Sequence, residues 1–174
     1  TIGHIKNMKK DIIIPTFQLS AVDKASGAKT AMPRIYSSFD KDDHKELLHS
    51  VVTKSAAAPT FFEDWQGYVD GALAGCNNPS LECLASVIDA GYNLSDVEIL
   101  SIGTGLSDNS CDGGDFGIIQ WAPKIIDYML NGSEEIAEFG TRALVKKFTR
   151  IQLRTKNSNQ CRSNRHLSRT GQPY

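Results

Sequence analysis

Apolar residues along the chain fall into two kinds of segment, short β-branched runs and longer helical repeats, which together are typical of a mixed α/β protein. The run at 11–20 predicts a buried strand, and Pro15 marks its end or its edge. A polar stretch at 21–31 is expected to connect it to a second strand at 34–39. The apolar run at 97–102 is the clearest strand of the sequence.

Two helices are expected in the first half of the chain. The first has apolar residues at helical spacing within 47–52, preceded by Asp43, whose spacing from Glu46 resembles a capping box. The second begins at Asn78, a good N-cap before a proline, and ends at Gly91.

Two further helices are expected in the second half. One covers 117–130 and is amphipathic, and the next starts at Ser133, a residue type that caps helices well. Its apolar residues predict a buried stripe, formed by Ile136, Phe139, Ala143, Leu144, Phe148 and Ile151.

Composition places the chain among soluble globular proteins with one domain. The 174 residues are 40% hydrophobic and 22% charged, and the net charge of -1 argues against a dedicated nucleic-acid surface. No window is apolar enough to span a membrane. The four cysteines form no Cys-x-x-Cys pair, and the acidic loop at 107–115 lacks EF-hand spacing, so neither a metal nor another cofactor is predicted.

The stretch around Asp70 is the strongest candidate for chemistry. Tyr68 and Val69 favour a strand that ends in this carboxylate, and Gly71 follows with backbone angles that other residues resist. A carboxylate at a sheet edge lies where α/β proteins place their sites, although Asp-Gly pairs are also common turn signals. Ser55 and Ser101 are interpreted as helix-end and strand-end residues.

Four segments, taken in order, resemble the patatin-like phospholipase family of lipid acyl hydrolases. They are Ser55-Ala-Ala-Ala-Pro-Thr-Phe-Phe, Val69-Asp-Gly-Ala followed by Asn77-Asn-Pro, Ile99-Leu-Ser-Ile-Gly-Thr-Gly, and Phe148-Thr-Arg-Ile-Gln. The resemblance implies a three-layer α/β fold, in which helices flank a central sheet. It also implies hydrolysis of phospholipid or other acyl-glycerolipid esters by a Ser–Asp dyad.

By this resemblance Asp70 is the general base, and Gly71 and Ala72 complete its motif. A carboxylate is a weak base toward a serine hydroxyl unless its environment raises its pKa. The family's nucleophile lies on a Gly-x-Ser-x-Gly elbow, and a glycine-rich loop forms its oxyanion hole. Neither motif occurs in these 174 residues.

The chain therefore resembles the C-terminal part of a patatin-like domain at 1–155, incomplete at its N-terminus and inactive alone, with a complementing N-terminal half expected. The basic polar tail at 156–174 is expected to be disordered. The expected location is the cytoplasm or the membrane periphery, where the chain would contact its lipid substrate. A non-catalytic patatin-like remnant that binds lipid or a partner protein is the alternative.

Overall fold

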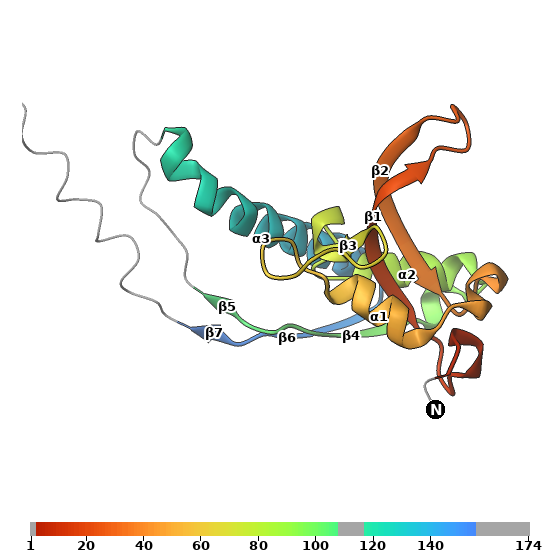
Figure 1. The fold of residues 1–174 in the computed structure, drawn as a ribbon. Helices are drawn as coiled ribbons and strands as arrows, with labels where there is room; N and C mark the ends of the chain where they lie inside the picture. Colours follow the sequence, from red (N-terminus) through yellow and green to blue (C-terminus); the bar gives the residue numbers. More distant parts are fainter. Residues whose placement is uncertain (1–2, 108–116, 156–174) are drawn as a thin grey trace, which may run out of the picture.

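The computed structural model describes residues 3–107 and 117–155, which form a mixed α/β structure, as the sequence predicts (Figure 1). The predicted tail at 156–174 and nearly all of the acidic loop lie outside the described residues. The elements are, in chain order, η1 Ile5–Asn7, β1 Ile13–Val22, β2 Lys29–Ser37, η2 Lys41–Lys45, α1 Leu48–Ala56, β3 Tyr68–Asp70, η3 Gly71–Ala74, α2 Ser80–Asp89, η4 Leu94–Asp96, β4 Glu98–Ile102, β5 Leu106–Ser107, α3 Ile118–Leu144, β6 Lys147–Ile151 and β7 Arg154–Thr155, where η denotes a 3-10 helix.

The first lobe is built on an antiparallel sheet with strand order β2-β1-β3. The β1–β2 hairpin turns at Asp23, whose side chain accepts a hydrogen bond from the Ser26 backbone N–H at 2.6 Å. Pro15 lies inside β1 and not at its end. On the β3 side, pairing with β1 begins only at Thr16, so Pro15 lies beyond the paired residues on that side. β1 is therefore the central strand, and it holds β3 in place.

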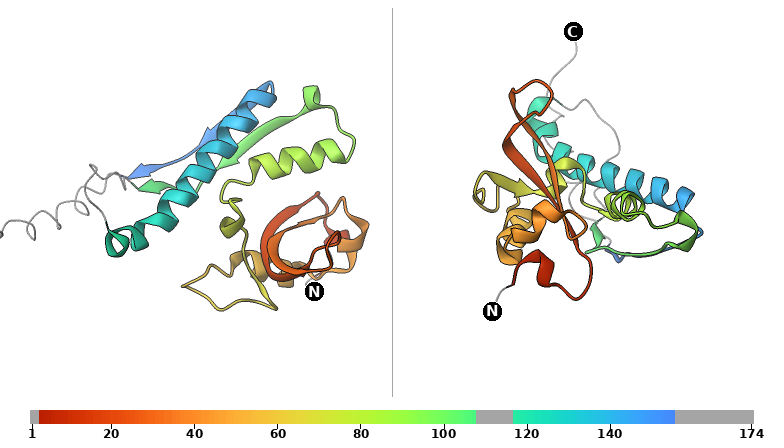
Figure 2. Two further views of the ribbon diagram at one scale, coloured as in Figure 1. Left: turned by 90° about the horizontal axis from the view of Figure 1, so that it is seen from above. Right: turned by 90° about the vertical axis from the view of Figure 1, so that its right-hand side faces the viewer.

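A small apolar core holds this lobe together. Its buried members are Ile5, Tyr36 and Val51, which come from η1, β2 and α1. Figure 2 shows α1 beside the β1–β2 hairpin. The burial of three large side chains from separate elements fixes α1 against the sheet.

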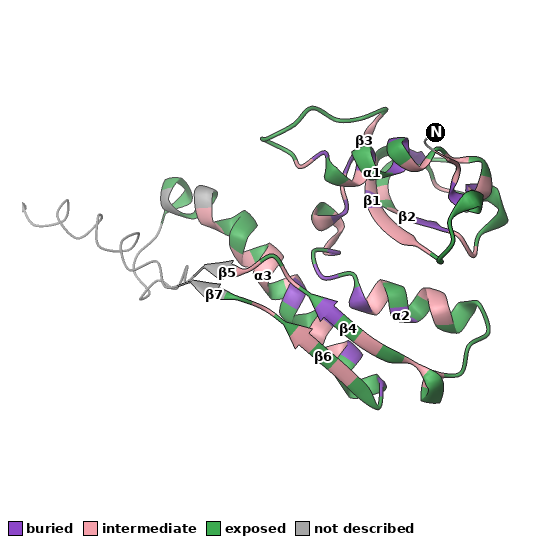
Figure 3. Cartoon of the chain, turned by 90° about the horizontal axis from the view of Figure 1, so that it is seen from below, coloured by how far each residue is buried: buried purple, intermediate pink, exposed green. Residues whose placement is uncertain are grey.

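The second lobe contains α2, α3 and two short parallel pairs, β4-β6 and β5-β7 (Figure 3). The chain leaves β4–β5, passes through α3 and returns as β6, which is a parallel crossover unit. The described strands thus form three small sheets, and no single central sheet joins them within the described ranges.

The spacing of Asp43 and Glu46 predicted a cap for the first helix, but Asp43 does not cap it. α1 begins at Leu48, and no side chain caps it. Asp43 is instead buried, pairs with Arg34 and accepts a hydrogen bond from the Ser37 backbone N–H at 2.9 Å. The carboxylate ties the loop to β2, because a buried charge needs a cation and donors around it.

α3 differs from the sequence prediction in two ways. It is one continuous helix of 27 residues, in which Ser133 is internal and its hydroxyl donates to the Leu130 carbonyl at 2.8 Å. The predicted apolar stripe is also largely exposed, and Ile136 and Phe139 keep 70% and 76% of their surface. Among the α3 residues whose burial is described, Glu134, Ala137 and Thr141 are buried. Across the part of the chain that the structure describes, no helix is long and apolar enough to cross a membrane.

Candidate functional site

Asp70 is the last residue of β3, at the point where the strand passes into η3. It pairs with Thr16 of β1, and its backbone N–H donates to the Ala57 carbonyl at 3.0 Å. The carboxylate is half-buried, and its Oδ1 accepts the Ala72 N–H at 2.8 Å. Among the described residues, none donates a hydrogen bond to Oδ2. The carboxylate is therefore oriented through one oxygen while the other is available to a hydroxyl group.

Gly71 is required for space and not for unusual backbone angles, which corrects the sequence interpretation. Its φ lies outside the left-handed region, whereas Gly75, which ends η3, has a φ of 84°. A Cβ at position 71 would lie 2.6 Å from the Pro15 carbonyl oxygen. The absence of a side chain thus allows the turn after Asp70 to pack directly on β1.

Tyr68 anchors the strand that carries Asp70. Its ring lies against Tyr36, with 6.1 Å between the ring centres, and the Lys54 ammonium lies 4.4 Å from the Tyr68 ring centre. Lys54 is itself buried and donates to the Tyr36 hydroxyl at 2.9 Å. Burial, followed by hydrogen bonding to Tyr36, raises the pKa of Tyr68 to about 12. Two residues before Asp70, the strand is therefore held by a packed polar cluster.

The serines of the two predicted segments have structural partners. Ser55 at the end of α1 donates to the Pro15 carbonyl at 2.8 Å. Ser101 in β4 is buried, donates to Asn78 Oδ1 at 3.2 Å and accepts from Arg150 at 2.5 Å. These partners agree with the interpretation of both serines as helix-end and strand-end residues.

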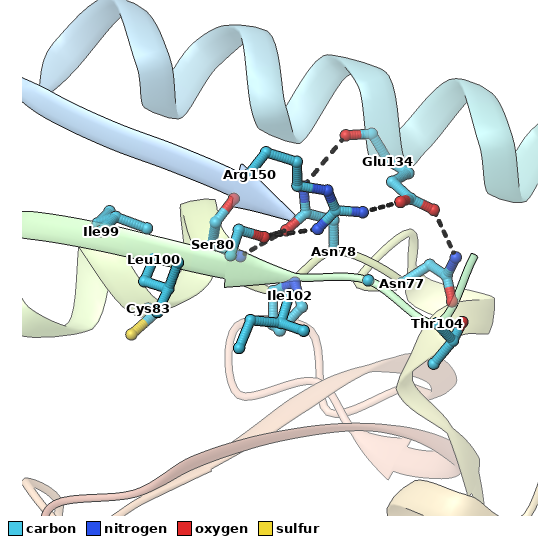
Figure 4. Close-up of a pocket in the computed structure, with 13 residues that line it drawn as sticks. Asn77, Asn78, Ser80, Cys83, Ile99, Leu100, Ile102, Thr104, Glu134 and Arg150 are labelled. Carbon is cyan, nitrogen blue, oxygen red and sulfur yellow. Dashed lines mark hydrogen bonds and ion pairs between the residues drawn. The ribbon is translucent and has the colours of Figure 1, made fainter. Parts of the chain in front are cut away.

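A separate pocket of about 270 Å³ lies in the second lobe, between α2, α3, β4 and β6 (Figure 4). Asp70, Gly71 and Ala72 are not among its lining residues. Its centre is the ion pair between Arg150 and Glu134, whose side chains are 9% and 10% exposed. Asn77 also donates to Glu134, at 3.0 Å.

This polar cluster joins four elements. Besides Glu134 and Ser101, Arg150 lies 3.8 Å from a carboxylate oxygen of Glu138. Asn78 accepts from the Ser80 backbone N–H at 3.3 Å. α2 begins at Ser80 with Pro79 as its N-cap residue, one position later than the sequence predicts, so Asn78 lies just before the cap. Glu138 also pairs with Arg142. The two carboxylates thus face two guanidinium groups, and the pocket offers no excess charge to a ligand.

Sequence reasoning identified Arg150 only as part of a family-like segment and missed its pairing with Glu134. A basic residue that alternates with apolar neighbours in a strand gives a weak signal for a buried ion pair. The described ranges contain no group of three or more His, Cys, Asp or Glu placed to hold a metal ion.

Two proteins are similar to part of this chain. Protein teg of Priestia megaterium is 29% identical over 102 residues, which cover 58% of this chain and 31% of that protein. The Bacillus subtilis protein named "Putative sporulation hydrolase CotR" is 28% identical over 102 residues, which cover 57% of this chain and 30% of that protein. The match thus spans less than a third of each relative, and it makes this chain a distant relative of a protein named as a hydrolase. No family model and no solved structure matches the chain.

Proposed function

We propose that this chain supplies the general base of a patatin-like serine acyl hydrolase that acts on phospholipid or acyl-glycerolipid esters. The observation that carries the proposal is the placement of Asp70 at the end of β3, with one carboxylate oxygen held by the Ala72 N–H. The distant similarity to a protein named as a hydrolase supports the same reaction class.

In the proposed reaction, Asp70 Oδ2 accepts the proton of a serine hydroxyl as the serine oxygen bonds to the ester carbonyl carbon. The same proton then passes to the departing alcohol, which leaves an acyl-serine ester. Water attacks this ester, Asp70 accepts a water proton, and the proton returns to the serine oxygen as the fatty acid leaves. Asp70 takes part in both the formation and the hydrolysis of the acyl-serine ester, and it is unchanged at the end.

The serine and the oxyanion donors belong, in this proposal, to residues outside this sequence, which contains no Gly-x-Ser-x-Gly motif. The complete domain would then have the three-layer architecture, with a sheet larger than the two-stranded pairs of this chain. Contact with a lipid surface follows from the substrate. The chain on its own is expected to be inactive.

The test uses a protein that joins this chain to a Gly-x-Ser-x-Gly segment. Hydrolysis of a p-nitrophenyl ester and labelling by a fluorophosphonate are compared between the original protein and its variants. Asp70→Asn is expected to lower the rate at least 100-fold, because removal of a general base costs about that much. Asp89→Asn changes an exposed carboxylate at the end of α2 and should leave the rate unchanged. Near-normal turnover by the Asp70 variant would contradict the assignment.

A non-catalytic patatin-like protein that binds lipid or a partner is the second candidate. It is favoured by the absence of the elbow motif from the sequence and by the lining of the described pocket, which does not include Asp70, Gly71 or Ala72. If the coding sequence around this chain contains no Gly-x-Ser-x-Gly segment, this candidate replaces the first.

A further inference from the structure

The segment at 58–67, between α1 and β3, presents three exposed aromatic side chains, and we call it the aromatic loop. Phe61 and Phe62 keep 81% and 67% of their surface, and Trp65 keeps 41%. All the residues at 59–66 are exposed, and Figure 3 shows this loop projecting from the first lobe. Exposed apolar side chains that gather at one place, rather than lying scattered, mark an interaction site.

The backbone of the aromatic loop has a defined conformation. At its start, the Phe62 backbone N–H donates to the Ala58 carbonyl at 3.0 Å. Thr60 and Gln66 have φ values of 76° and 57°, in the left-handed region that residues other than glycine rarely adopt. Such positions cost energy and are typical of functional segments whose surroundings hold them in place. The fold therefore sets the outward position of the aromatic side chains.

Both ends of the aromatic loop are attached to the strand that carries Asp70. Ala57, which precedes the loop, accepts the Asp70 backbone N–H at 3.0 Å. Near the other end, the Trp65 backbone N–H donates to the Tyr68 carbonyl at 2.9 Å, and the Tyr68 N–H donates to the Trp65 carbonyl at 3.1 Å. Four residue steps lead from Ala57 to Phe61, and a chain of that length spans at most about 14 Å. A surface that the loop contacts is therefore brought close to Asp70.

The composition of the aromatic loop suits the boundary between water and an uncharged lipid surface. Tryptophan is enriched at that boundary, and tryptophan and phenylalanine are typical of the apolar side of segments that lie there. The only charged residues at 58–67 are Glu63 and Asp64, so the loop offers no cation to an anionic lipid. A protein partner would need preformed pockets for two projecting phenylalanine rings, whereas a fluid lipid layer accepts them without one.

We infer that the aromatic loop binds a zwitterionic phospholipid surface, of which phosphatidylcholine is the example, by inserting Phe61, Phe62 and Trp65. The inference rests on the proposed function for the use of this contact, which is to bring an ester of the same lipid to Asp70. Interfacial side chains reach about 5–10 Å below the headgroups. Since the loop extends at most about 14 Å from Ala57, the contact holds Asp70 near the headgroups and not among the acyl chains.

The experiment measures co-sedimentation of the whole chain with phosphatidylcholine vesicles. Phe61→Ser together with Phe62→Ser should weaken binding about tenfold or more, because two rings no longer leave water. The matched control is Ile118→Ser together with Ile119→Ser, which removes two residues of α3 that are 88% and 85% exposed and should leave binding unchanged. Circular dichroism checks that both double variants fold. Phosphatidylserine added to the vesicles should weaken binding, because its charge repels the two acids of the loop.

The two tryptophans of the chain allow the contact to be located. Trp121→Phe leaves Trp65 as the single tryptophan, and brominated phosphatidylcholine in the vesicles should quench its fluorescence. Trp65→Phe leaves Trp121 in α3, whose fluorescence should be unaffected.

The inference is overturned if the chain does not bind the vesicles, if the Phe61 and Phe62 double variant binds as tightly as the original, or if Trp121 is quenched as strongly as Trp65. It is also overturned if light scattering shows that the two phenylalanines instead join two copies of the chain. The protein joined to a Gly-x-Ser-x-Gly segment separates this inference from the proposed function. Vesicle binding without ester hydrolysis upholds the lipid contact and rejects the proposed function, whereas hydrolysis of the soluble p-nitrophenyl ester without vesicle binding does the reverse.

Discussion

Gly71 shows how the absence of one side chain fixes the position of the candidate base. Gly71→Ala is expected to destabilise the fold by about 1–3 kcal/mol, because its Cβ would overlap the Pro15 backbone, which cannot move without shifting β1. Gly132→Ala is the matched control, since its Cβ would meet no atom within 4 Å and lies in a helix. It should stabilise the fold by about 0.5–1 kcal/mol. Urea denaturation measures both, and equal effects would contradict this account of Gly71.

Cys76 predicts a loss of stability at alkaline pH. Burial, followed by the charge and hydrogen bonding of Glu82, raises the pKa of Cys76 to about 12. The unfolded thiol ionises near pH 8.5, so between about 8.5 and 12 the unfolded state loses its proton first and is favoured. Each pH unit in this window costs at most about 1.4 kcal/mol for one proton.

Urea denaturation between pH 7 and pH 10 tests this dependence. Cys76→Ala should flatten the alkaline decline, while at pH 7 it changes only packing, because the thiol is then neutral in both states. Tyr68 contributes a smaller decline that begins near pH 10, for the same reason. An unchanged slope in Cys76→Ala would show that other groups control the alkaline transition.

The ion pair between Arg150 and Glu134 couples α3 to β6. Arg150→Met should destabilise the second lobe by about 3–5 kcal/mol, because it leaves the buried Glu134 carboxylate without its cation. Adding Glu134→Gln removes that charge, and the amide can still accept from Asn77. The double variant is therefore expected to be more stable than Arg150→Met alone. Additive losses in a double-mutant cycle would show that the pair does not interact.

The elements of this chain could largely be predicted from periodicity, but what each face contacts could not. The 3.6-residue repeat correctly identified α3 as amphipathic, yet placed Ile136 and Phe139 inside, because a pattern defines a face and not its cover. Asp43 has N-cap spacing, but Arg34 of β2 pairs with it instead. The position of Asp70 at the end of a strand was predictable locally, since Tyr68 and Val69 favour a strand. The packing of Gly71 on Pro15 joins residues more than fifty positions apart and has no local signal.

The molecule as a whole consists of two lobes that differ in how much of their apolar surface is buried. The first has its own apolar core of Ile5, Tyr36 and Val51, under a three-stranded sheet. The second buries Leu84, Ala137 and Val145 beside the polar contacts of Arg150 and exposes the apolar face of α3. Because burial of apolar surface is the main source of stability, the first lobe should be the more stable of the two.

Hydrogen exchange followed by mass spectrometry would test this difference in the chain alone. Backbone amides of β1 are expected to exchange slowly, while those of 118–130 in α3 should exchange at least tenfold faster, because this half of the helix extends away from the body with exposed side chains on its surface (Figure 1). Equal protection of both segments would contradict the expected difference in stability between the two lobes.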